Sequence, residues 1–217
     1  MTPDPSGRPH MPTDAEPARR RRSRDPAAVR RSLLNVAAEA FQVRGYHSTS
    51  THEIARAAGV TGGAMHHHFP TKKSLGLAVI RDRVAATIEE VWIQPVVAAP
   101  TAAEGIDAVF EKIVAGIEAD NKVQGCPLNN LSVELSTVDP EFRDALQEVF
   151  QKWRSAIEDK LRSDQGSGSG QHTDPHALAL FVVAAYSGAM TMAKVAQSPA
   201  PLKSCAQQVR QLLATGV

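Results

Sequence analysis

Apolar residues recur every three to four positions along most of the chain, which is the spacing of one face of an α-helix. The first such run extends from Val29 to Phe41. Asp25 is a suitable N-cap, Pro26 suits a first helical turn and Gly45 suits a helix end, so we predict a first helix between Pro26 and Gly45.

The same periodicity predicts helices in the rest of the chain. They fall at 50–59, 62–68, 72–92, 101–121, 125–136, 140–162, 175–196 and 201–214. Pro95 and Pro100 are expected to interrupt the chain after the fourth helix, and Gly166–Gly170 is expected to be a flexible loop. We find no alternating strand pattern, so the predicted fold class is all-α.

Two short helices near the N-terminus form a helix-turn-helix pattern. Ser50 and Glu53 make a capping box, and Gly59 permits the tight turn that follows. Val60 and Met65 are expected to fill the core between the two helices. In such a motif the second helix enters the major groove of DNA.

Charge is divided unevenly along the chain. Residues 1–92 hold 14 Lys and Arg against 9 Asp and Glu, a net charge of +5, whereas the remainder holds 10 against 14, a net charge of −4. We expect residues 1–25 to be a disordered basic arm in which Arg21, Arg22 and Arg24 contact phosphates or a minor groove. The alternative is a solvated tail that only aids solubility.

The composition suits a soluble protein, with 42% hydrophobic and 22% charged residues. No uninterrupted apolar run reaches the roughly 18 residues of a membrane span, and the start does not resemble a signal peptide, so a cytoplasmic location is expected. The two cysteines, Cys126 and Cys205, lie far apart and do not suggest a disulfide framework.

The stretch from Ala27 to Trp92 resembles the tetracycline-repressor (TetR) family. The resemblance rests on motifs that agree in order and spacing: Ala37-x-x-x-Phe41, Gly45-Tyr46, Thr49-Ser50-Thr51, Ile54-Ala55-x-x-Ala58-Gly59-Val60-Thr61 and His67-His68-Phe69-Pro70-x-Lys72-x-x-Leu75. Further on, Gly125–Leu131 and Asp139–Arg143 look like a segment found in one branch of the family. The resemblance implies about nine helices, a homodimer, and repression that a small effector relieves.

The resemblance also implies which residues contact DNA. These are Thr51 and His52 at the start of the second helix, Thr61, Gly62, Gly63, Ala64, His66 and His67 in the third, and Lys72 at the start of the fourth. Thr61 would cap the third helix and bind a phosphate, and Ala64 would present its methyl group to a thymine.

Two positions depart from the family pattern. Gly62 stands where a longer polar residue often reads bases, so specificity would depend on backbone approach, DNA shape, or His52 and His67. His66 replaces the usual phosphate-binding tyrosine, which would make that contact pH-dependent.

The remaining candidate sites have structural alternatives. The three consecutive histidines His66, His67 and His68 point about 100° apart on one helix, so we expect DNA contact and packing there and no metal site. Cys126 lies at a helix N-terminus, where a thiol can become a redox sensor, although a small buried hydrophobe is the favoured interpretation. Effector-binding candidates are Trp92, Phe110, Asn130, Glu134, Trp153, Tyr186 and Met190.

The domain organisation follows from these assignments. Residues 26–71 are expected to form the helix-turn-helix domain and 72–217 the effector-binding and dimerisation domain, with the last two helices forming a four-helix interface between subunits. The predicted function is a ligand-responsive transcriptional regulator that binds double-stranded DNA, a small effector and a second copy, without a cofactor. The alternatives are a helical adaptor that binds a protein partner and an all-α enzyme, although the sequence holds no nucleophile elbow, P-loop or zinc signature.

Overall fold

A computed structural model of the chain describes residues 25–166 and 174–215. Counting the continuous stretch from Lys72 to Ala98 as one helix, these residues form nine helices and no strand, which confirms the all-α prediction. The predicted basic arm and residues 167–170 of the predicted Gly/Ser loop lie outside the described residues.

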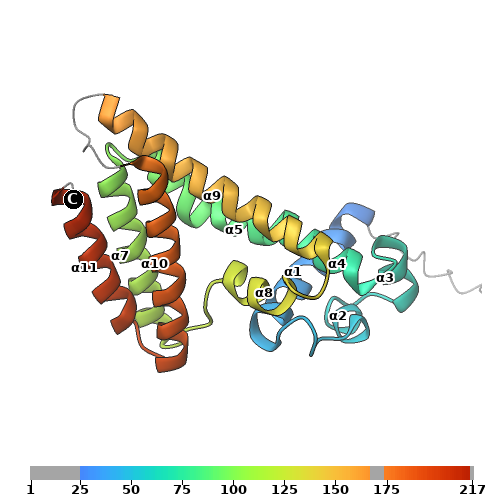
Figure 1. The fold of residues 1–217 in the computed structure, drawn as a ribbon. Coiled ribbons are helices and arrows are strands. Elements are labelled where there is room, and N and C mark those ends of the chain that lie inside the picture. The colour runs from blue at the N-terminus through green and yellow to red at the C-terminus, as the bar shows by residue number, and fades with distance from the viewer. Residues whose placement is uncertain (1–24, 167–173, 216–217) are drawn as a thin grey trace, which may run out of the picture.

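Three helices form one end of the molecule (Figure 1): α1 (Pro26–Arg44), α2 (Thr51–Ala57) and α3 (Gly62–His68). Asp25 caps α1 through a bond to the backbone nitrogen of Ala27, and the predicted Ser50–Glu53 capping box is present at α2. The helices are held together by buried apolar side chains: Leu33, Leu34, Ala37, Phe41, Ile54, Ala55 and Met65.

A long helix connects this end to the rest of the molecule. It comprises α4 (Lys72–Val79), a π-helical turn η1 (Ile80–Val84), α5 (Ala85–Ile88), a second π-helical turn η2 (Glu89–Ile93) and α6 (Gln94–Ala98). Its predicted inward side is confirmed, because Leu75, Val79, Val84 and Ile88 are all buried.

The prediction that Pro95 interrupts this helix is wrong. Proline lacks a backbone N–H and crowds the carbonyl one turn earlier, which normally stops a helix. Here the wider turn η2 comes just before it, and Gln94 N–H bonds the carbonyl of Glu89, five residues back. The widened turn accommodates the proline ring without ending the helix, which continues to Ala98.

The opposite end is a helical bundle of α7 (Ala102–Asp120), α10 (Pro175–Ala196) and α11 (Ala200–Thr215). Helix α9 (Pro140–Gly166) lies beside the Lys72–Ala98 helix and contacts its successive segments. It runs one turn beyond the predicted end and includes Gly166. The short helix α8 (Pro127–Leu135) lies between the bundle and α1.

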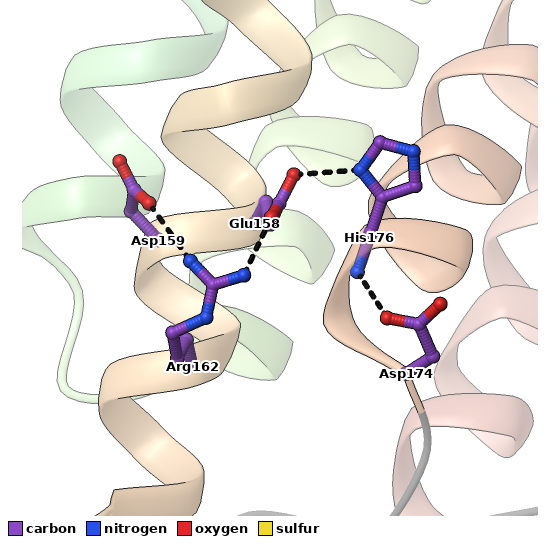
Figure 2. A network of polar contacts seen from close by, with 5 residues as sticks. All are labelled: Glu158, Asp159, Arg162, Asp174 and His176. Carbon is purple, nitrogen blue, oxygen red and sulfur yellow. Dashed lines mark hydrogen bonds and ion pairs between the residues drawn. The ribbon is translucent and has the colours of Figure 1, made fainter.

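A polar network joins α9 to the start of α10 (Figure 2). Glu158 accepts bonds from Arg162 Nη2 at 2.6 Å and pairs with His176 Nδ1 at 3.0 Å. These two partners hold the pKa of the Glu158 carboxyl below its usual value. Asp174 caps α10 by accepting from the backbone nitrogen of His176 at 3.0 Å. The network fixes where α10 begins against α9.

Helix α10 is long and apolar enough to cross a membrane by length and composition, and no other helix within 25–166 and 174–215 is. Its apolar side chains lie on two faces. One face enters the core through Leu178, Val182, Val183, Tyr186 and Ala193. The other faces outward, with Leu180 51%, Phe181 47%, Met192 64% and Val195 84% exposed. A core helix with a second apolar face explains this hydropathy without a membrane.

Candidate DNA-binding surface and effector cleft

The surface formed by the start of α2 and by α3 with its N-cap holds eight of the twelve residues predicted to contact DNA. Arg21, Arg22 and Arg24 lie outside the described residues, and Lys72 begins α4. Met65 alone in α3 is buried and anchors the helix to the core. Six of the predicted residues are exposed to solvent: His52, Thr61, Gly62, Gly63, His66 and His67. Thr51 and Ala64 are partly exposed. A Cβ added at Gly62 or Gly63 would meet nothing within 4 Å, so both glycines offer bare backbone to an approaching ligand.

The N-terminus of α3 is capped as predicted. Thr61 Oγ1 accepts from the backbone nitrogen of Ala64 at 3.2 Å, which leaves the hydroxyl hydrogen free to donate to a ligand. Ahead of it, Gly59 adopts a positive φ of 65°, as the turn prediction required.

Lys72 is engaged within the protein. Its Nζ donates to the carbonyl of His47 at 3.2 Å and lies 4.5 Å from the centre of the Tyr46 ring. Burial lowers the pKa of this ammonium. A phosphate contact would therefore require Lys72 to share or leave these partners. Its neighbour Lys73 pairs with Asp139, just before α9, at 2.7 Å and with Glu141, in the first turn of α9, at 2.6 Å.

Four of the predicted effector residues form one aromatic cluster. The Trp92 ring lies 5.6 Å from Phe110, 5.0 Å from Trp153 and 4.7 Å from Tyr186, measured between centroids. All four are nearly inaccessible to solvent, and Trp153 Nε1 is buried without a hydrogen-bond acceptor. Edge-to-face packing of this kind contributes about 1 kcal/mol per pair beyond burial. The rings are the centre of the bundle core.

The other three predicted effector residues, Asn130, Glu134 and Met190, line a different feature. We call it the junction cleft, a hollow of about 490 Å³ between α1, α8 and α10. Its apolar wall consists of Phe41, Val43, Val133, Met190 and Val195, and its polar wall of Gln42, Arg44, Asn129, Asn130, Glu134, Thr191 and Lys194. This volume and mixed lining are typical of small-molecule sites.

A chain of hydrogen bonds crosses the junction cleft. Lys194 Nζ on α10 donates to Asn130 Oδ1 on α8 at 3.0 Å, and Asn130 Nδ2 donates to Gln42 Oε1 on α1 at 3.0 Å. Gln42 Nε2 in turn donates to the carbonyl of Gly125 at 2.6 Å. Helix α10 of the bundle is thereby linked to the first helix of the DNA-binding unit.

Glu134 makes a second link between the two ends. Its Oε2 accepts from the backbone nitrogen of Tyr46 at 2.8 Å, and its Oε1 from that of His47 at 2.6 Å. The turn fits only because Gly45, at a φ of 86°, has no side chain; a Cβ there would lie 3.1 Å from Glu134 Oε2. Helix α8 therefore holds the loop that leads into α2.

Comparisons with known sequences decide the family. The sequence profile described as "Bacterial regulatory proteins, tetR family" matches residues 33–79. The profile described as "Transcriptional regulator LmrA/YxaF-like, C-terminal domain" matches residues 102–208. The chain belongs to the TetR family. The two profiles match an N-terminal and a C-terminal region of this TetR-family chain, which confirms the resemblance seen in the sequence.

Curated relatives of this TetR-family chain are transcriptional regulators. The HTH-type transcriptional repressor DhaR of Mycobacterium sp. (strain GP1) is 27% identical over 182 residues, which cover 80% of this chain and 86% of DhaR. Transcriptional regulator AcuR of Cereibacter sphaeroides is 28% identical over 201 residues, 90% of each chain. The chain is accordingly a DNA-binding transcriptional regulator, and the enzyme alternative is excluded.

Solved structures agree with the fold. The regulatory protein TetR from Rhodobacter sphaeroides superposes with a TM-score of 0.75 at 26% identity, covering 84% of this chain and 97% of that one. The reduced form of Escherichia coli NemR superposes with a TM-score of 0.79 at 22% identity, covering 86% and 97%. The likeness to NemR supports the shared architecture alone.

Two members of the hydrogen-bond chain, Gln42 and Lys194, were not predicted from the sequence. Lys194 carried a usable signal, because it is the one Lys, Arg, Asp or Glu in the segment Pro175–Ala196. A lone charge in an apolar helix has to find a polar partner or reach solvent. Gln42 gave no signal, since it is one of several polar residues on the first helix.

Proposed function

We propose that this TetR-family chain is a cytoplasmic homodimeric repressor that leaves a palindromic operator when a small effector occupies the junction cleft. The exposed surface of α3 supports the DNA part of the proposal. Thr51, His52, Thr61, His66 and His67 are then the groove and phosphate contacts, and Gly62 and Gly63 let the backbone approach the DNA closely.

The outward face of α10 supports the dimer. Small residues follow its midline at helical spacing, Ala177, Ala184 and Gly188, and larger apolar side chains flank them. A Cβ at Gly188 would meet nothing within 4 Å, so a second helix can approach there. The neighbouring edge of α11 has no charge at Pro201, Ser204, Cys205 and Gln208. A second copy of the chain would bury this face across a two-fold axis.

Helix α8 provides the route from effector to operator. It lines the junction cleft through Asn130 and holds the Tyr46–His47 loop through Glu134. An effector that binds better when α8 has shifted would alter the position of that loop and of α2 and α3 behind it. Met190 and Asn130 are then direct contacts, whereas Trp92, Phe110, Trp153 and Tyr186 form the packed floor behind them.

The experiment is a binding titration of the full-length chain with the DNA upstream of its own gene, followed by fluorescence anisotropy. The proposal expects saturable, salt-sensitive binding to one duplex, and a footprint over an inverted repeat with half-sites about one helical turn apart or a multiple. Binding that is equal for all duplexes, or a footprint over a single half-site, would contradict it.

A further inference from the structure

The junction cleft contains a positive charge without a counterion. Among the described residues, no carboxylate lies within 4.0 Å of Lys194 Nζ, and its hydrogen-bond partner is the neutral amide of Asn130. Glu134, the carboxylate in the cleft lining, already accepts a backbone N–H on each of its oxygens. An ammonium in a partly buried wall without an opposite charge is an unfavourable arrangement that an anion would relieve.

The surrounding backbone is shaped to hold Lys194 in this position. Gly125 has a φ of 88°, and a Cβ there would lie 2.9 Å from Lys194 Cδ and 3.0 Å from Asn130 Oδ1. The absence of that side chain lets the lysine stem and the amide lie against the loop. Gln42 fixes the same loop through the carbonyls of Gly125 and Gln124 at 2.6 and 3.3 Å.

Charge across the cleft lining favours an anion as well. Arg44 and Lys194 are its two cations, and Glu134 is its one carboxylate. Arg44 lies on the exposed last turn of α1, so it adds attraction at the edge and not a buried contact. The rest of the lining is uncharged. It combines the polar side chains of Gln42, Asn129, Asn130 and Thr191 with the apolar side chains of Phe41, Val43, Val133, Met190 and Val195.

We infer that the effector is a small organic carboxylate, whose charged group pairs with Lys194 and whose apolar part lies against Met190 and Val133. This inference rests on the proposed function, because it names the chemical class of the effector at the same cleft. Lys194 Nζ carries three N–H donors and the bond to Asn130 Oδ1 uses one of them, so a carboxylate oxygen can accept from another. A carboxylate that draws the ammonium toward itself would strain the bond between α10 and α8, and Asn130 carries that link onward to Gln42.

The test measures binding by calorimetry with four named probes: butyrate and benzoate, and their uncharged counterparts butyramide and benzamide. We expect at least one acid to bind wild type at least tenfold more tightly than its amide. Lys194→Met should weaken acid binding at least tenfold, and Lys194→Arg should retain it. Lys203→Met is the matched control, because it removes a lysine of α11 that pairs with Glu118 on α7 and does not line the junction cleft.

Three results would overturn the inference: no binding of either acid, equal binding of acid and amide, or unchanged acid binding in Lys194→Met. Folding of each variant is checked by its melting temperature and by operator binding without ligand. The outcome separates the two proposals. If the chain binds its operator and is released by neutral compounds alone, the inference of a carboxylate effector is refuted and the proposed repressor function stands. A chain that binds the acids and never an operator refutes the repressor.

Discussion

The Glu134 carboxylate lies 2.8 Å from the backbone nitrogen of Tyr46, although the two residues are 88 positions apart in the sequence. Glu134 belongs to α8 in the effector-binding part, and Tyr46 to the loop between α1 and α2. A charged acceptor for two consecutive backbone N–H groups is a strong and directional contact. The position of the DNA-binding helices therefore depends on where α8 lies.

Replacing Glu134 with glutamine tests this dependence. The amide keeps the size of the side chain but offers one acceptor oxygen in place of two, so one backbone N–H loses its partner. We expect the free energy of unfolding to fall by about 1.5–3 kcal/mol, the usual worth of a hydrogen bond to a charged group. Operator affinity, measured by anisotropy, should fall as well. Glu148→Gln on the exposed surface of α9 is the control and should change neither.

Gly63→Ala should separate stability from DNA binding. The added Cβ meets nothing within 4 Å, and alanine favours a helix by up to about 1 kcal/mol over glycine, so the melting temperature should rise or stay level. If α3 presents its bare backbone to DNA, the same methyl group should weaken operator binding at least fivefold. Unchanged operator affinity would contradict the proposed role of the glycines.

Gly188→Glu should disrupt the proposed dimer. It places a carboxylate on the midline of the outward face of α10, where burial against a second copy would leave it unpaired. Light scattering should detect a monomer, and operator affinity should fall about 100-fold because the two half-sites are then bound independently. Gly116→Glu on α7 is the matched control, since a Cβ there also meets nothing within 4 Å. A dimeric Gly188→Glu variant would refute this interface.

Local signals in the sequence predicted the helices well. The Ser50–Glu53 box, the Thr61 cap and Gly45 were all found where expected, because caps and turns depend on residues close in sequence. The Lys194–Asn130–Gln42 chain was missed because it joins helices far apart in the sequence, and helical periodicity carries no information about which helices meet. Pro95 was misjudged because a π-helical turn leaves no recognised sequence pattern.

Asp139 should make stability depend on pH. The bond to Lys73 holds the pKa of its carboxyl below the usual value near 3.9. A carboxyl with a lowered pKa stabilises the folded state above its unfolded pKa, and the contribution is lost as the pH falls through the folded value. The melting temperature of Asp139→Asn should therefore lie further below wild type at pH 7 than at pH 3. A melting temperature equally far below wild type at both pH values would contradict the ion pair. Asp144→Asn is the control, and its melting temperature should not move away from wild type between pH 3 and pH 7.

Cys126 should be inert in the folded protein. It is 4% exposed, and burial raises the pKa of its thiol, so little thiolate is present at neutral pH. We expect a thiol reagent such as DTNB at pH 8 to leave Cys126 unmodified until urea is added. Rapid labelling of Cys126 in native protein, or loss of operator binding after peroxide treatment of Cys205→Ser, would support the sensor alternative.

The two π-helical turns in the Lys72–Ala98 helix also affect how its relatives are compared. Each such turn holds one residue more than the α-helical repeat, which rotates everything beyond it by about 100°. A homologue that lacks one of the turns would present a different set of side chains to α9 from the same aligned positions. Gapless alignment across Ile80–Ile93 would then pair core residues of one protein with surface residues of another, and a single-residue gap there would mark the loss of one π-helical turn with the later side chains kept on the same faces.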